Sequence, residues 1–99
     1  MEYTTTRSDD HTTVFLSGEV DLDRSPDARK ALLDAVAHGQ TIVVDMQQVE
    51  YIDSSGVASL VEALQASRKN NLEFSLQNVS EPALKVFRLA RLEKVFNII

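Results

Sequence analysis

The sequence predicts an α/β fold in which a four- to five-stranded, mixed but mainly parallel sheet is covered by about three helices. Short β-branched, apolar runs alternate along the chain with longer segments whose apolar residues recur at helical spacing. This order is typical of parallel strands joined by right-handed crossovers. The 99 residues, 43% of them hydrophobic, are enough for one core but not for two. We therefore expect a single domain over residues 1–99.

The chain opens with a predicted β-hairpin. Residues 12–17 read Thr-Thr-Val-Phe-Leu-Ser, a β-branched and apolar run that favours a strand. A weaker strand around Tyr3 to Arg7 is expected to pair with it through the polar turn of residues 8–11.

The first helix is predicted near residues 26–38. Ser25 is a suitable N-cap, Pro26 fits the first helical position, and Gly39 ends the apolar pattern. The next segment, Thr41 to Met46, is short, β-branched and almost wholly apolar. It predicts a central strand that is covered on both faces.

Two more helices and two more strands complete the expected fold. Val57, Leu60, Val61 and Leu64 fall on one face of a helix near residues 55–69, which Asn70-Asn71 would end in a left-handed conformation. Residues 73–77 alternate polar and apolar and read as a half-buried strand. Ser80-Glu81-Pro82 opens a helix near residues 81–91, and residues 95–99 are expected to form a last short strand.

Composition excludes several classes of protein. The chain has no cysteine, which rules out a disulfide scaffold, a thiolate zinc site and a cysteine nucleophile. Its net charge of −5, without clustered basic and aromatic residues, argues against a nucleic-acid partner. No apolar run approaches the roughly 20 residues that cross a bilayer, and no signal peptide is evident. We expect a cytoplasmic protein without direct membrane insertion.

The tetrapeptide Asp53-Ser54-Ser55-Gly56 lies between a strand-like run that ends at Tyr51-Ile52 and the second predicted helix. The first turn of a helix has unpaired N–H groups and a partial positive charge. A serine at this position can act as the N-cap, and a phosphate added to it would be met by ready donors. The sequence alone leaves both interpretations open, a simple cap or a phosphorylation switch.

Enzyme motifs are mostly missing. The only glycines, at positions 18, 39 and 56, lie too far apart for a phosphate-binding loop or a nucleophile elbow. His11 falls in a predicted turn and His38 at a helix end, so we expect no catalytic residue, no metal site and no cofactor. Asp45, inside the central strand, is interpreted as a residue that bonds to nearby backbone in preference to a functional one.

Three segments carry a resemblance to a known family. The segments are Gly18-Glu19-Val20-Asp21, the strand of residues 42–46, and residues 49–57 with the Asp-Ser-Ser-Gly block. In this order they resemble STAS domains of the bacterial anti-sigma-factor antagonist family, and the likeness extends over nearly the whole chain. The resemblance implies a STAS-type single domain.

The same resemblance implies a role and its residues. In that family the serine after the aspartate, here Ser54, is phosphorylated by a serine kinase that is also an anti-sigma factor. The unphosphorylated protein binds this kinase and frees its captive partner, and a serine phosphatase resets the cycle. Asp21, Asp53 and Gly56 match residues of the partner-binding switch loop, and Ser55 is expected to belong to the same loop in a structural role.

Two other functions remain open at this stage. The chain also resembles STAS accessory subunits of lipid-transport ABC systems, in which the domain supports a permease and its ATPase. An enzyme that uses Ser54 as its nucleophile is the least favoured, because no base is evident. The identity of the proteins that co-purify with the chain separates the first two.

Overall fold

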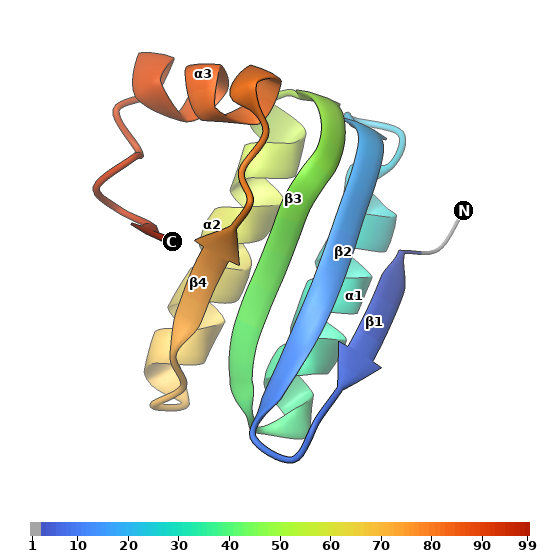
Figure 1. The fold of residues 1–99 in the computed structure, drawn as a ribbon, viewed down its shortest axis with the longest axis vertical. Coiled ribbons are helices and arrows are strands. Elements are labelled where there is room, and N and C mark those ends of the chain that lie inside the picture. The colour runs from blue at the N-terminus through green and yellow to red at the C-terminus, as the bar shows by residue number, and fades with distance from the viewer. Residues whose placement is uncertain (1–2) are drawn as a thin grey trace.

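The structure is a computed structural model that describes residues 3–99. These residues form one five-stranded sheet and three helices (Figure 1). The strands are β1 (Thr4–Arg7), β2 (His11–Val20), β3 (Thr41–Ile52), β4 (Phe74–Gln77) and β5 (Asn97–Ile98), and the helices are α1 (Ser25–His38), α2 (Ser54–Lys69) and α3 (Glu81–Leu89).

The strand order follows the chain, β1-β2-β3-β4-β5, with β3 in the centre. The β1–β2 pair is antiparallel and the other three pairs are parallel, which confirms the mixed, mainly parallel sheet. β3 is longer than the expected segment of residues 41–46, because its last residues continue to pair with the end of β2 up to Val20 and Ile52. The strand-like run before Asp53 is thus the end of the central strand.

Helices α1 and α2 cover the same face of the sheet (Figure 1). Both crossovers step in the same direction along the strand order, so right-handed connections place both helices on one side. Ile42, Val44 and Met46 of β3 are fully buried on this face. Thr41 and Val43, which alternate with them, are only half-buried. The expectation that residues 41–46 are covered on both faces is therefore met only in part, because α1 and α2 cover one face and only Asp45 is buried on the other.

The predicted helix boundaries are confirmed closely, with one correction at α1. Ser25 is the first helical residue, and the N-cap position belongs to Arg24, whose side chain makes no capping bond. Gly39 ends α1 with φ of 86°, and Asn71 follows α2 in the left-handed region with φ of 59°. Ser80 caps α3, since its hydroxyl accepts a hydrogen bond from the Ala83 N–H.

Asp45 of β3 is bonded to the end of β4, where the chain turns toward α3. Residues 73–77 were expected to be half-buried, but Phe74, Ser75 and Leu76 of β4 are all buried. Asp45 is only 7% exposed, and its carboxylate accepts hydrogen bonds from the Gln47 N–H and from the side-chain amides of Gln77 and Asn78. The expected hydrogen bond between Asp45 and nearby backbone is confirmed, although two of its three donors are side chains.

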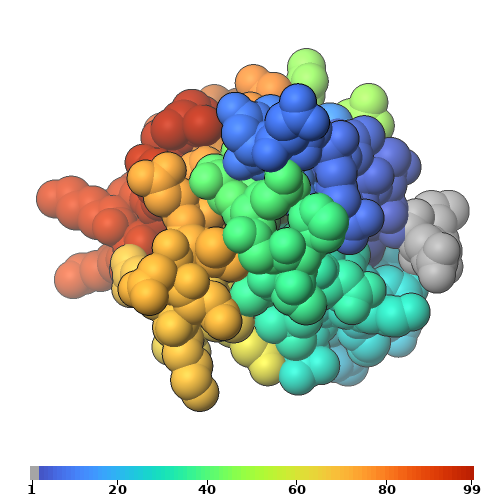
Figure 2. All heavy atoms as spheres, turned by 90° about the horizontal axis from the view of Figure 1, so that it is seen from below, coloured from blue at the N-terminus to red at the C-terminus, as the bar shows by residue number. Residues whose placement is uncertain are grey.

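One end of the sheet carries the turns that enter β2, β3 and β4, and the other carries the strand ends that lead into α1 and α2. Figure 2 shows the lower end, where the turns of residues 8–11, 39–41 and 70–73 lie close together. The carboxyl ends of β2 and β3 lie at the opposite end, where the chain enters α1 and α2 (Figure 1). In open α/β sheets that end is the usual place for a functional site.

Candidate functional site

The candidate site begins where β2 and β3 end side by side. Val20 and Ile52 are partners in the parallel register, and each is followed by an aspartate, Asp21 and Asp53. The Asp53 N–H also donates to the Val20 carbonyl oxygen, at 3.3 Å. The two aspartates that the sequence singled out therefore leave adjacent strands at the same edge of the sheet.

Asp53 is the N-cap of α2. Its backbone is extended, and its Oδ1 accepts hydrogen bonds from the Ser55 N–H at 2.9 Å and the Gly56 N–H at 3.2 Å. Of the two interpretations that the sequence left open, the simple serine cap is wrong, because aspartate is an equally good capping residue and here precedes both serines. The expectation of ready donors for a phosphate is corrected as well, since these two donors are already bound to a carboxylate.

Asp21 accepts backbone N–H groups in the same way in the turn that leads into α1. Its Oδ1 accepts hydrogen bonds from the Asp23 N–H at 3.1 Å and the Arg24 N–H at 3.2 Å, and its carbonyl oxygen accepts from the Ser25 N–H at 2.7 Å. The Arg24 side chain makes no capping bond, and Asp21 instead accepts the N–H group of Ser25, the first residue of α1. The two aspartates fix two neighbouring turns in the same way.

Gly56 packs the first turn of α2 against the strand ends. A Cβ at this position would overlap the Val20 carbonyl oxygen and lie 2.7 Å from Ile52 Cγ1. The hydroxyl of Ser59, one helical turn later, lies within hydrogen-bond distance of the carbonyl oxygens of Ser55 and Ser25. The start of α2 is thus attached to β2 and to the start of α1.

Ser54 is exposed, and it is the first residue of α2. It lines an apolar groove of about 420 Å³ between α2 and α3, which we call the α2–α3 groove. Ser55, the next residue, is half-buried and does not line the groove. The groove is lined by Ser54, Val57, Ala58, Val61, Glu62, Gln65, Val86 and Ala90.

The α3 side of this groove was not foreseen from the sequence. Val86 of α3 is only half-buried, and Ala90, at the end of α3, is exposed. On α2, Ala58 and Val61 widen the apolar stripe beyond the strictly buried positions. An apolar stripe wider than the core requires is the signal that could have indicated an additional contact surface.

The two histidines lie at the end of the sheet away from Ser54. His11 begins β2 and His38 ends α1. In the β1–β2 turn, the Ser8 hydroxyl and the Asp10 carboxylate both contact the same ring atom, His11 Nδ1, at 2.9 and 2.8 Å. The His11 contact, together with the Ser8 hydroxyl, lowers the pKa of Asp10. A catalytic triad needs its serine and its aspartate on different ring nitrogens, so this turn is not one.

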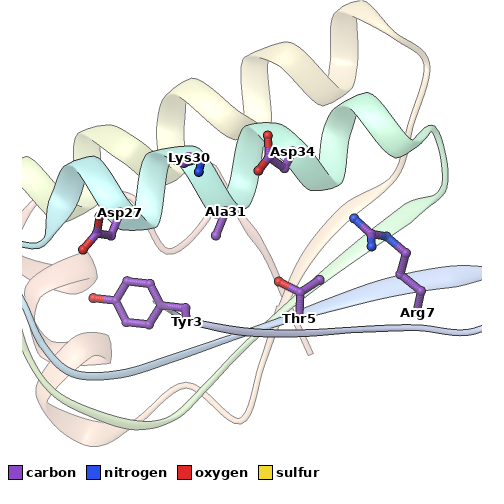
Figure 3. A pocket seen from close by; sticks show the side chains of 7 residues that line it. All are labelled: Tyr3, Thr5, Arg7, Asp27, Lys30, Ala31 and Asp34. Atoms are coloured by element: carbon purple, nitrogen blue, oxygen red, sulfur yellow. The ribbon is translucent and has the colours of Figure 1, made fainter. Parts of the chain in front are cut away.

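A second hollow, of about 210 Å³, separates β1 from α1 (Figure 3). Burial raises the pKa of the Tyr3 phenol beside it, partly opposed by the charge of Arg24. The hollow is lined by Tyr3, by Thr5 and Arg7 of β1 and by Asp27, Lys30, Ala31 and Asp34 of α1.

Within residues 3–99 no group of three or more His, Cys, Asp or Glu side chains is placed to hold a metal ion. None of the helices in this part of the chain is long and apolar enough to cross a membrane.

The importance of the Asp53 cap can be measured directly. We expect Asp53→Ala to lower the free energy of unfolding by about 1 to 2 kcal/mol, because two N–H groups lose their acceptor. Asp53→Asn should restore most of it, since an amide oxygen accepts the same bonds. Urea denaturation of these variants, with exposed Asp23→Ala as the control, checks the assignment. An Asp53→Ala variant as stable as the parent would contradict it.

Comparison with known proteins places these features in a family. The family model described as "Mlab, STAS domain" matches residues 3–99. An anti-sigma-B factor antagonist of Listeria monocytogenes is 29% identical over 93% of this chain and 82% of its own length.

Solved structures share the fold. An anti-sigma factor antagonist from Mycobacterium paratuberculosis is 23% identical over 97% of this chain and 82% of its own, with a TM-score of 0.84. The Bacillus cell fate determinant SpoIIAA, solved in its phosphorylated form, is 21% identical over 98% of this chain and 90% of its own, with a TM-score of 0.75.

Proposed function

The chain belongs to the STAS domain family, and from this membership we propose that it is an anti-sigma-factor antagonist whose binding is switched off by phosphorylation of Ser54. One observation carries the proposal. Ser54 is an exposed hydroxyl at the head of an apolar groove, so a change of its charge alters the surface that a partner would meet. The proposal treats residues 1–99 as one STAS domain that acts in the cytoplasm.

The relatives support this function. The matching curated proteins of Listeria monocytogenes and Bacillus subtilis are both named anti-sigma-B factor antagonists. SpoIIAA, an anti-sigma factor antagonist of the same fold, has been solved in an unphosphorylated and in a phosphorylated form. In the proposed cycle the partner of this chain is an anti-sigma factor that is also a serine kinase, and a serine phosphatase removes the phosphate.

The physical effect of a phosphate at Ser54 follows from its surroundings. A phosphate brings about −1.5 to −2 charges at pH 7. The N–H groups of Ser55 and Gly56 are already bound to Asp53, so the new charge would lie beside a carboxylate with few free donors. A partner that covers the groove would have to desolvate this charge, at a cost of several kcal/mol. Binding is therefore expected to fall much more than stability.

Co-purification tests the proposal. The tagged protein and its Ser54→Asp variant are expressed in the source cell, and the proteins that bind each are identified. We expect an ATP-binding serine kinase with the parent chain and much less of it with the variant. A membrane permease with its ATPase, bound equally by both, would contradict the proposal and support the transporter-subunit alternative.

Asp21→Asn tests whether charge at the neighbouring turn contributes to docking. Asparagine keeps an oxygen that can accept the Asp23 and Arg24 N–H bonds, so the melting temperature should change by less than about 2 °C. We expect kinase binding to weaken about three- to tenfold, because one negative charge is lost beside Ser54. Asp9→Asn, at an exposed position between β1 and β2 at the opposite end of the sheet, is the matched control for net charge. Equal binding of Asp21→Asn and the parent would remove Asp21 from the site.

A further inference from the structure

Leu22 lies at the tip of the turn between β2 and α1, and it is 70% exposed. A single exposed leucine is ordinary on a flexible loop, but this turn is held by hydrogen bonds throughout. The carboxylate and carbonyl oxygens of Asp21 accept bonds from the N–H groups of residues 23, 24 and 25. The Ser25 hydroxyl in turn donates to the Leu22 carbonyl oxygen, at 3.3 Å. Leu22 is thus presented by a fixed turn.

The turn is attached at both ends to the first two turns of α2. At its start, the Val20 carbonyl oxygen accepts the Asp53 N–H and lies against Gly56. At its end, the Ser25 carbonyl oxygen lies 3.3 Å from the Ser59 hydroxyl. The position of Leu22 relative to Ser54 is therefore set by contacts on either side of it.

We propose that Leu22 is an apolar anchor that the anti-sigma factor buries when it docks over Ser54. This inference rests on the proposed function and names a contact residue of the same interface. Leu22 contributes little to the core, so its exposed surface is free to be buried by a partner. Because the turn is already ordered, docking loses little conformational entropy there.

The charges around Leu22 indicate what kind of surface receives it. Its neighbours Asp21 and Asp23 carry carboxylates, and Glu19, near the end of β2, is exposed. Two copies of this chain that met at the turn would bring these carboxylates together, which disfavours self-association. The complementary partner surface is an apolar pocket bordered by Lys or Arg side chains.

The test compares two exposed leucines. Leu22→Ser and Leu89→Ser, the latter 78% exposed on α3, are titrated by calorimetry against the kinase purified with the parent chain. We expect Leu22→Ser to bind at least about tenfold more weakly and Leu89→Ser to stay within about twofold of the parent. Both should melt within about 2 °C of it. Leu22→Met, which keeps an apolar side chain of similar size, should retain most of the affinity.

The same titration separates failure of this inference from failure of the proposed function. The parent chain and Ser54→Asp are included as references. If the parent binds and Ser54→Asp binds poorly, while Leu22→Ser binds as the parent does, the anchor is overturned and the switch stands. Equal losses in Leu22→Ser and Leu89→Ser would also overturn it. If the parent does not bind, the proposed function fails and the anchor fails with it.

Discussion

Gly56→Ala is expected to lower the free energy of unfolding by about 3 kcal/mol, the largest stability effect of any single substitution proposed for this chain. The added methyl group would overlap the Val20 carbonyl oxygen, which is main chain and cannot rotate away, and would crowd Ile52. At an ordinary helix position the same change would stabilise by up to about 1 kcal/mol. A loss of about 3 kcal/mol lowers the melting temperature by about 12 to 20 °C, which calorimetry measures readily.

Gly39→Ala provides the matched control. Gly39 has φ of 86°, and no atom lies within 4 Å of the position of its missing Cβ. Its substitution should therefore cost only the backbone strain, about 1 to 2 kcal/mol. A Gly56→Ala variant that melts with the parent, or above Gly39→Ala, would show that α2 does not approach β2 as closely as described.

Ser54→Asp is expected to fold as the parent does and to bind the kinase at least about tenfold more weakly. Aspartate carries only about half the charge of a phosphate, so a partial loss is the expected result. A negative side chain at the start of α2 is favoured by the helix dipole and opposed by Asp53, which leaves stability within about 1 kcal/mol of the parent. Calorimetric titration and thermal melting measure the two quantities separately.

Two controls support the interpretation of Ser54→Asp. Ser54→Ala should bind as the parent does but resist phosphorylation, because it removes the hydroxyl without adding charge. Asn97→Asp adds the same charge at an exposed position of β5 and should leave binding within about twofold. Equal weakening by Asn97→Asp would mean that net charge, rather than the position of Ser54, governs binding.

Much of the fold was accessible from local signals. Proline and glycine mark the two ends of α1, because Pro26 fits its first turn and Gly39 adopts the left-handed conformation that ends it. Ser80 caps α3 as its spacing predicted. The apolar run that begins at residue 41 fixed the central strand, since it is the segment best suited to a buried position in the sheet.

The parts that were missed depend on contacts between distant segments. The choice of Asp53 over the serines as N-cap is supported by Val20, which holds the Asp53 N–H from the neighbouring strand. The close approach of Gly56 to β2 and the α3 wall of the groove likewise arise from packing. Hydrophobic periodicity identifies which face of a helix is apolar, but not which part of that face stays exposed after folding.

Phosphosite mapping combined with a binding titration tests the switch at Ser54 most directly. The parent chain is incubated with the co-purified kinase and ATP, the phosphate is located by mass spectrometry, and the modified and unmodified forms are titrated against the kinase. The account predicts one phosphate, on Ser54 and not on Ser55, and binding by the modified form that is at least about a hundredfold weaker. A phosphate on Ser55, no phosphate on either serine, or equal binding of the two forms would contradict it.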